Sequence, residues 1–191
     1  TLAAATSGVV TATISDGDLA TLDGLTETGN AYSITITDAS VDAAALNTLD
    51  GKTTVAIDAS TITTLTGAAA DLNTAYDSAG ISNLGDEAVT LSDTSLAASV
   101  LNTLDDNTTG TIDASTVTTL TGSADDLITA YDANGSGITG LGNEAATLSD
   151  TTLAVSVLNT LDDNTTGTID AGTVTTLTGA AADLNTAFAS S

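Results

Sequence analysis

A fourteen-residue phrase recurs in this chain and sets the register of the residues around it. The phrase LNTLDDNTTGTIDA begins at Leu101 and again at Leu158, and the variant LNTLDGKTTVAIDA begins at Leu46. The successive spacings are 55 (101 − 46) and 57 (158 − 101). The two extra positions lie in a Gly/Ser-rich loop, where YDSAGISNLG becomes YDANGSGITGLG. Because the change in length is confined to one loop, the other residues keep a common register, which predicts stacked repeats.

A shorter period lies within the long one. Phrases of the type TISD, TITD, TLSD and TIDA carry an aspartate, and the successive gaps are 22, 20, 35, 20, 37 and 20, at Asp16, Asp38, Asp58, Asp93, Asp113, Asp150 and Asp170. A step of about 20 residues is typical of solenoids with one strand per turn. We therefore predict coils of about 20 residues, with an extra irregular turn in each of the two longer gaps.

Each short phrase changes its hydrophobic period after the aspartate. Alternating Val, Thr and Ile residues before it indicate a strand. After Asp93 and Asp113 the spacing is helical, through Leu96, Val100, Leu101 and Leu104, and through Val117, Leu120, Leu127 and Tyr131. These patterns predict a parallel β-solenoid or β-helix with short helices on its coils, an α/β solenoid being the close variant. Residues 1–35 form a junction segment and first coil, and residues 36–191 form the tandem repeats.

The composition predicts a thin core and a strongly acidic surface. Of the 191 residues 41% are apolar but only 2% are aromatic, and Met, Trp, Cys and Pro are absent. The formal net charge of −24, with a single Lys or Arg, excludes nucleic acid as a partner because phosphate binding depends on basic side chains. No apolar run approaches the roughly 18 residues of a membrane-spanning helix, so we expect no membrane insertion. Screening of like charges favours a salty, extracellular setting.

The missing residue types argue against catalysis. Without His or Cys the chain lacks the usual acid–base and nucleophilic groups. Carboxylate pairs remain, but Asp105–Asp106 and Asp162–Asp163 are copies of one another, whereas an active site is normally single. We therefore predict that the protein is not an enzyme and requires no cofactor.

Calcium is the one cofactor that the sequence suggests. Hard cations bind clustered oxygen atoms, and the periodic loop DDNTTG offers such atoms, as does the stretch SDGDLATLDG. The candidate ligands are Asp105, Asp106, Asn107, Asp162, Asp163, Asn164, Asp16 and Asp18. Lys52 places a cation in the first copy of the loop, and the calcium-binding nonapeptide of β-rolls is missing. The alternative is a solvated turn in which Asp and Asn serve the turn geometry.

Glycans are a further candidate partner. The patterns NTT at Asn107 and Asn164 and NGS at Asn134 match N-glycosylation acceptors. Tyr76, Tyr131 and Phe188 share one repeat position, with spacings of 55 (131 − 76) and 57 (188 − 131). A column of rings at this position is either a packed core ladder, which we favour, or a sugar-binding strip.

The long repeat resembles known sequences. The stretch GLGNEAATLSDTTLAVSVLNTLDDNTTGTIDAGTVTTLTGAAADLNTA resembles tandem repeats of large, acidic, Thr-rich surface or secreted proteins of marine cyanobacteria, described as hemolysin-type or adhesin-like. AALNTLDG at Ala44–Gly51 is similar to phage tail-fibre repeats. Both resemblances imply an elongated extracellular element without catalytic activity.

These observations predict a structural protein. Neither end of the sequence offers a charged capping segment, and uncapped solenoids expose strand edges that recruit further strands. We expect copies to join end to end as a homopolymer, forming an extracellular filament or cell-surface fibre. The alternative is a binding module, either a calcium-stiffened adhesin or a receptor binder similar to a phage tail fibre.

Overall fold

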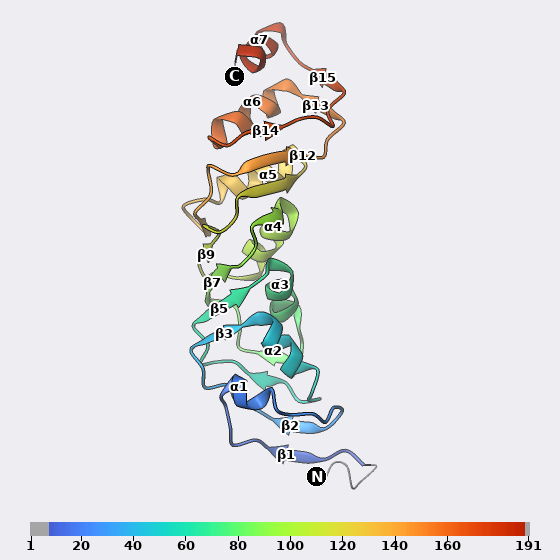
Figure 1. Ribbon diagram of the computed structural model, residues 1–191, viewed down its shortest axis with the longest axis vertical. Helices are drawn as coiled ribbons and strands as arrows, with labels where there is room; N and C mark the ends of the chain where they lie inside the picture. The colour runs from blue at the N-terminus through green and yellow to red at the C-terminus, as the bar shows by residue number, and fades with distance from the viewer. Residues whose placement is uncertain (1–7, 190–191) are drawn as a thin grey trace. The chain divides into compact units, whose positions relative to one another are not determined.

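The computed structural model describes residues 8–189 of the chain. Contacts divide the chain into two compact units, one of residues 1–90 with 107–111 and the other of residues 91–106 with 112–191. Both units are built from parallel strands that alternate with short helices (Figure 1). The predicted repeat of strands and helices is thus confirmed, whereas the division at residue 35 stays a prediction.

Seven short helices occur among the described residues. They are α1 Leu19–Leu22, α2 Ala43–Asp50, α3 Ala69–Asp77, α4 Ala98–Asn107, α5 Ala124–Asp132, α6 Val155–Asn164 and α7 Ala181–Ala189. Each helix contains a phrase of the form Leu-x-Thr-(Leu or Ala). In α1 the phrase directly follows the N-cap residue Asp18, whereas in α2 three residues separate the N-cap Asp42 from the phrase. The leucines that begin this phrase are Leu19, Leu46, Leu72, Leu101, Leu127, Leu158 and Leu184.

The strands are short and all their pairings are parallel. In the first unit they are β1 Thr11–Thr13, β2 Ala31–Ser33, β3 Ser40–Asp42, β4 Ile57–Asp58, β5 Thr64–Gly67, β6 Ile81–Ser82 and β7 Ala88–Leu91, whose last residue belongs to the second unit. In the second unit they are β8 Ser95–Ala97, β9 Ile112–Asp113, β10 Thr119–Gly122, β11 Ile138–Thr139, β12 Ala145–Leu148, β13 Thr152–Ala154, β14 Ile169–Asp170 and β15 Thr176–Thr178.

Sheet order is repetitive within each unit. The first unit pairs β1 with β2 and β4 with β6, and places β5 between β3 and β7. The second unit holds a sheet of order β8-β10-β12-β14, with β9 beside β11 and β13 beside β15. Helices α2 and α3 lie side by side in Figure 1 and contact each other, as α5 contacts α6 and α6 contacts α7.

The step between paired strands differs from the coil length that the aspartates predict. Among the described strands, only β1 and β2 pair at a step of 20 (31 − 11). A step of 24 (64 − 40) joins Ser40 to Thr64, and the same step joins Ile57 to Ile81, Ser95 to Thr119 and Thr152 to Thr176. The predicted coil length was too short because the aspartates do not occupy equivalent positions along the strands. Asp58 lies opposite Thr35 rather than Asp38.

Two predicted helical stretches begin as strands. Leu96 lies in β8 and Leu120 lies in β10, so the helices start later, at Ala98 and Ala124. The aliphatic spacing of three and four positions continues across each strand–helix boundary, which hides the change of period. Gly122 ends β10 with φ +150°, a conformation that favours glycine and stops the strand before α5.

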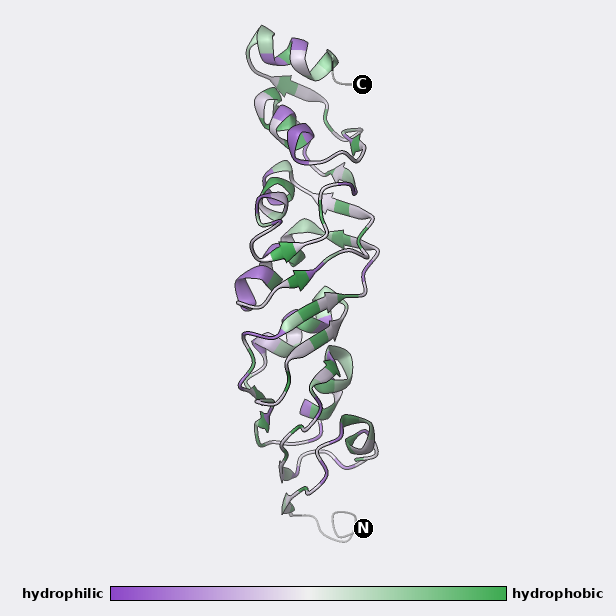
Figure 2. Ribbon diagram, turned by 90° about the vertical axis from the view of Figure 1, so that its left-hand side faces the viewer, coloured by the Kyte–Doolittle hydropathy of each residue, from purple (hydrophilic) through white to green (hydrophobic). Residues whose placement is uncertain are grey.

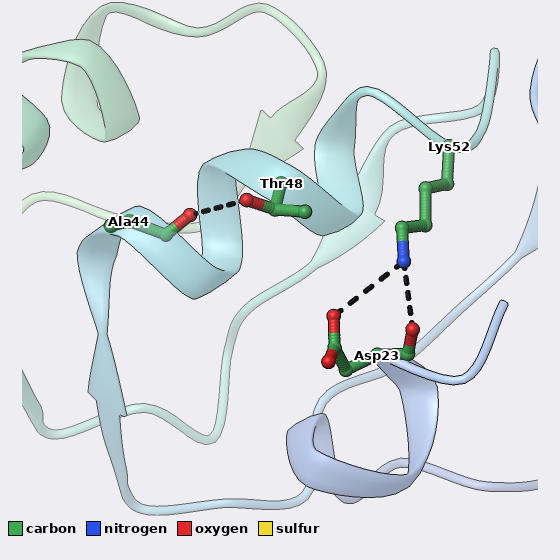
Figure 3. Close-up of polar contacts among 4 residues, drawn as sticks. All are labelled: Asp23, Ala44, Thr48 and Lys52. Carbon is green, nitrogen blue, oxygen red and sulfur yellow. Dashed lines mark hydrogen bonds and ion pairs between the residues drawn. The ribbon is translucent and has the colours of Figure 1, made fainter. Parts of the chain in front are cut away.

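Threonine hydroxyl groups donate hydrogen bonds to backbone carbonyl groups in helices and in turns. In helices α2 to α7 the hydroxyl of the phrase threonine donates to the carbonyl four positions earlier, as Thr48 does to Ala44 at 2.9 Å (Figure 3). In the turn before β10, the Thr116 hydroxyl donates to the Leu91 and Asp93 carbonyls at 3.0 Å. The Thr-rich composition is therefore explained by hydrogen bonds to the backbone.

Aliphatic residues form the core of each unit. In Figure 2 hydrophobic and hydrophilic residues alternate along the ribbon, as expected for elements with one buried face. Leu46 in the first unit and Leu101 in the second are both 0% exposed.

Candidate functional site

The predicted calcium ligands of the DDNTTG loop lie at the C-terminal end of helices α4 and α6. Asp105 is half-buried, and burial followed by the charge of Asp106 raises the pKa of its carboxyl group. Asn107 ends α4, and its amide donates to the Asn73 side-chain oxygen at 3.1 Å. In the second copy Asp162 and Asp163 are exposed, and the Asn164 amide donates to the Asp132 carboxylate at 3.3 Å.

The predicted ligands near the N-terminus serve local structure. Asp18 caps α1, accepting from the backbone N–H of Thr21 at 2.9 Å and from its hydroxyl at 3.1 Å. Asp16 is exposed. Within residues 8–189 no three His, Cys, Asp or Glu side chains gather closely enough to hold a metal ion. Calcium binding stays a prediction.

Lys52, the one basic side chain of the chain, binds the end of α1. Its ammonium group donates to the Asp23 carbonyl at 2.8 Å and lies 3.6 Å from the Asp23 carboxylate (Figure 3). The Asp23 side chain is 78% exposed, so this ion pair contributes little stability.

Two buried glutamates were missed by the sequence analysis. Glu144 is 1% exposed, and its Oε2 accepts from the backbone N–H groups of Gly142 at 2.8 Å and Asn143 at 3.2 Å. Its Oε1 and the buried hydroxyl of Tyr131 have no hydrogen-bond partner. Burial raises the pKa of Tyr131, Thr165 opposes the shift, and the charge of Glu144 adds to it. The two groups are thus close enough to interact without a well-formed hydrogen bond.

The first unit holds the same arrangement. Glu87 is 1% exposed, its Oε2 accepts from the Gly85 N–H at 2.8 Å, and its Oε1 is unpartnered. Burial raises the pKa of Tyr76 to about 12, with the charges of Glu87 and Asp86 acting in the same direction. The phrase Leu-Gly-(Asp or Asn)-Glu, present at residues 84–87 and 141–144, was the sequence signal for these glutamates. We regard the clusters as parts of the repeat, because they recur with it.

The most unusual surface lies on the last repeat, residues 158–189. Four core residues of the preceding long repeat are 0% exposed, but their equivalents here are all partly exposed. The equivalent pairs are Leu101 and Leu158, Ile112 and Ile169, Leu120 and Leu177, and Leu127 and Leu184. A hollow of about 470 Å³ lies on this face, lined by Leu158, Asn159, Ile169 and Ala187 among others. Phe188 on α7 is 78% exposed. Residues that form the core in one repeat therefore form an open apolar face in the last.

No protein family, curated protein or solved structure matches the chain. The resemblance to cyanobacterial surface repeats and tail fibres stays a prediction. No helix in the described part of the chain is both long and apolar enough to cross a membrane.

Proposed function

We propose that the protein is a non-catalytic structural subunit of an extracellular filament or surface fibre, in which solenoid copies stack head to tail. The observation that carries the proposal is the open apolar face of the last repeat. A neighbour that covered Phe188 and the hollow would bury the same residue types that the preceding repeat buries within the chain. Each large apolar side chain so covered contributes about 1.5–3 kcal/mol.

Repeat architecture supports the same proposal. In a solenoid each repeat is stabilised by its neighbours, and an uncapped end presents both apolar side chains and strand edges. In the second unit β15 pairs with β13, and in the described residues no strand pairs with its other edge. A parallel strand from a second copy would continue the pattern of the β8-β10-β12-β14 sheet.

Net charge sets the conditions for assembly. At −24 the copies repel one another, and this repulsion opposes any end-to-end contact. The Debye length shortens from about 10 Å at 0.1 M salt to about 3 Å at 1 M salt, so added salt favours assembly. A salty extracellular medium suits such a filament.

Sedimentation velocity over a range of protein concentrations, in dilute buffer and in about 0.5 M NaCl, tests the proposal. We expect species larger than the monomer that increase with salt, and filaments in electron micrographs. Phe188→Asp should return the protein to the monomer with an unchanged circular dichroism spectrum. Ser99→Asp, which adds the same charge at an exposed position of α4, should still assemble. A wild-type chain that remains monomeric at every concentration and salt level contradicts the proposal.

A further inference from the structure

We propose that Asn134 is a deamidation site that the folded second unit protects, so that a chain that unfolds is modified at this residue and cannot recover its native loop. The hydrogen bonds of one loop and the chemistry of the Asn-Gly sequence support this inference, which does not depend on the proposed filament.

Asparagine followed by glycine is the sequence in which deamidation is easiest. The backbone nitrogen of the following residue attacks Cγ of the asparagine, ammonia leaves and a cyclic imide forms. Water then opens the imide to give aspartate, or isoaspartate with an extra methylene group in the backbone. Glycine favours the attack because it has no Cβ and its backbone turns freely. Asn134–Gly135 is the only Asn-Gly pair in the sequence.

In the folded chain the reacting groups of this pair are held by hydrogen bonds. The amide nitrogen of Asn134 donates to the Leu141 carbonyl at 3.0 Å, and its Oδ1 accepts from the Leu141 N–H at 3.3 Å. The N–H of Gly135, the attacking nitrogen, donates to the Ile138 carbonyl at 2.7 Å. The attack removes the proton that Gly135 donates, and loss of ammonia removes the donor to Leu141. The folded loop therefore opposes the reaction, whereas the unfolded chain does not.

The first unit has a shorter loop at the same place and lacks these bonds. Its sequence YDSAGISNLG, residues 76–85, is two residues shorter than YDANGSGITGLG, residues 131–142, and contains no Asn-Gly pair. Leu84, which corresponds to Leu141, is partly exposed, whereas Leu141 is 9% exposed. The inserted residues and the Asn134 bonds thus accompany the burial of a leucine that the first unit leaves open.

Deamidation would remove a donor on which the loop depends. With aspartate at position 134, a carboxylate oxygen would face the Leu141 carbonyl in place of the amide nitrogen, leaving two acceptors without a proton between them. Isoaspartate would also lengthen the backbone beside the bridge between Asn134 and Ile138. The loop leads into Gly142, whose N–H donates to the buried carboxylate of Glu144. A change at Asn134 therefore disturbs a buried part of the second unit.

Mass spectrometry of proteolytic peptides measures the reaction in the wild-type chain. At mildly alkaline pH we expect Asn134 to deamidate about 10- to 1,000-fold faster in guanidinium chloride than in native buffer, the effect of opening three hydrogen bonds. Asn107 and Asn164, each followed by threonine, are internal controls and should react much more slowly than Asn134 in the denaturant. A ratio below about 10 between the two conditions overturns the protection by the fold. Equal rates for the three asparagines in the denaturant overturn the choice of site.

The consequence of the reaction has its own variant. Asn134→Asp should raise the equilibrium constant of unfolding about 5- to 100-fold, because the Leu141 carbonyl loses its donor. Asn143→Asp is the matched control: it adds the same charge at a nearby exposed position, where the first unit naturally has Asp86. This control should stay within about 2-fold of the wild-type equilibrium constant.

Denaturant titrations of both variants decide whether the modified loop can recover. Greater loss of stability in Asn134→Asp than in Asn143→Asp supports the inference, as does failure of Asn134→Asp alone to fold. Equal stability of the two variants would mean that the loop tolerates the change, and overturns the inference.

Discussion

Tyr131 and Phe188 occupy the same position of successive long repeats, yet the first is 6% exposed and the second 78% exposed. The difference arises from the neighbours of each helix. Helix α5, which carries Tyr131, is covered by α6, whereas no described residue covers the corresponding face of α7. The same sequence therefore serves as core in one place and as a surface in another, which allows matched comparisons within a single unit.

The first prediction compares two leucines at equivalent repeat positions, one buried and one partly exposed. Leu101 is 0% exposed and Leu158 is partly exposed, at equivalent positions of α4 and α6. Leu101→Ala should lower the free energy of unfolding by about 2–5 kcal/mol, because it leaves a cavity in a packed core. Leu158→Ala should cost less than half as much in the monomer. Urea denaturation below the assembly concentration measures both, and equal losses would contradict the open face.

The second prediction concerns the unpartnered Tyr131 hydroxyl. Tyr131→Phe removes a buried polar group that lacks a hydrogen bond, so we expect the free energy of unfolding to rise by about 1 kcal/mol. Phenylalanine occurs naturally at the equivalent position 188. The control Tyr131→Ala should lower the free energy of unfolding by about 3–5 kcal/mol through loss of the ring. A clear loss of stability in Tyr131→Phe would mean that the hydroxyl is bonded to Glu144.

The sequence predicted the repeat and its alternation of strand and helix because identical phrases at fixed spacing fold into the same local elements. It predicted the step between strands less well, because Asp38 and Asp58 have similar neighbours but different places in the register. Only backbone pairing distinguishes them. The phrase Leu-x-Thr, by contrast, occurs in every described helix and so marks the helices.

The candidate site was predicted only in part. The aspartates of the DDNTTG loop were identified, but their surroundings depend on side chains from other repeats, such as Asn73 beside Asn107. The buried glutamates could not be recognised, since a sequence does not reveal that Glu144 points inward while Asn143 stays exposed. The open face of the last repeat could be recognised only from the structure, in which the equivalent residues of the preceding long repeat are buried.

The third prediction concerns a glycine of the DDNTTG loop. A Cβ atom on Gly167 would meet the backbone carbonyl oxygen of Glu144, which cannot move without disturbing the strand that follows. Gly167→Ala should therefore lower the free energy of unfolding by about 1–3 kcal/mol. Gly51→Ala is the control, because its backbone is helical and the nearest atom to the new Cβ is 3.5 Å away. That substitution should be neutral or slightly stabilising.

The fourth prediction is a loss of stability at high pH. The pKa of Tyr76 is raised to about 12 by burial and by the charges of Glu87 and Asp86, whereas an unfolded tyrosine ionises near pH 10. Between these values the unfolded chain has lost the proton and the folded chain has kept it. The contribution of Tyr76 to the free energy of unfolding is therefore fully present below about pH 10, and it is lost as the pH rises toward 12.

Absorbance of the tyrosinate band during a pH titration measures this effect, with urea denaturation at each pH. Tyr76→Phe should remove a tyrosine transition near pH 12 and flatten the decline of stability above about pH 10. Tyr32→Phe, at a ring whose hydroxyl accepts a hydrogen bond from Asn30 at 3.0 Å, is the matched control and should keep the decline. If Tyr76 titrated together with free tyrosine, its hydroxyl would have to lie in water rather than beside Glu87.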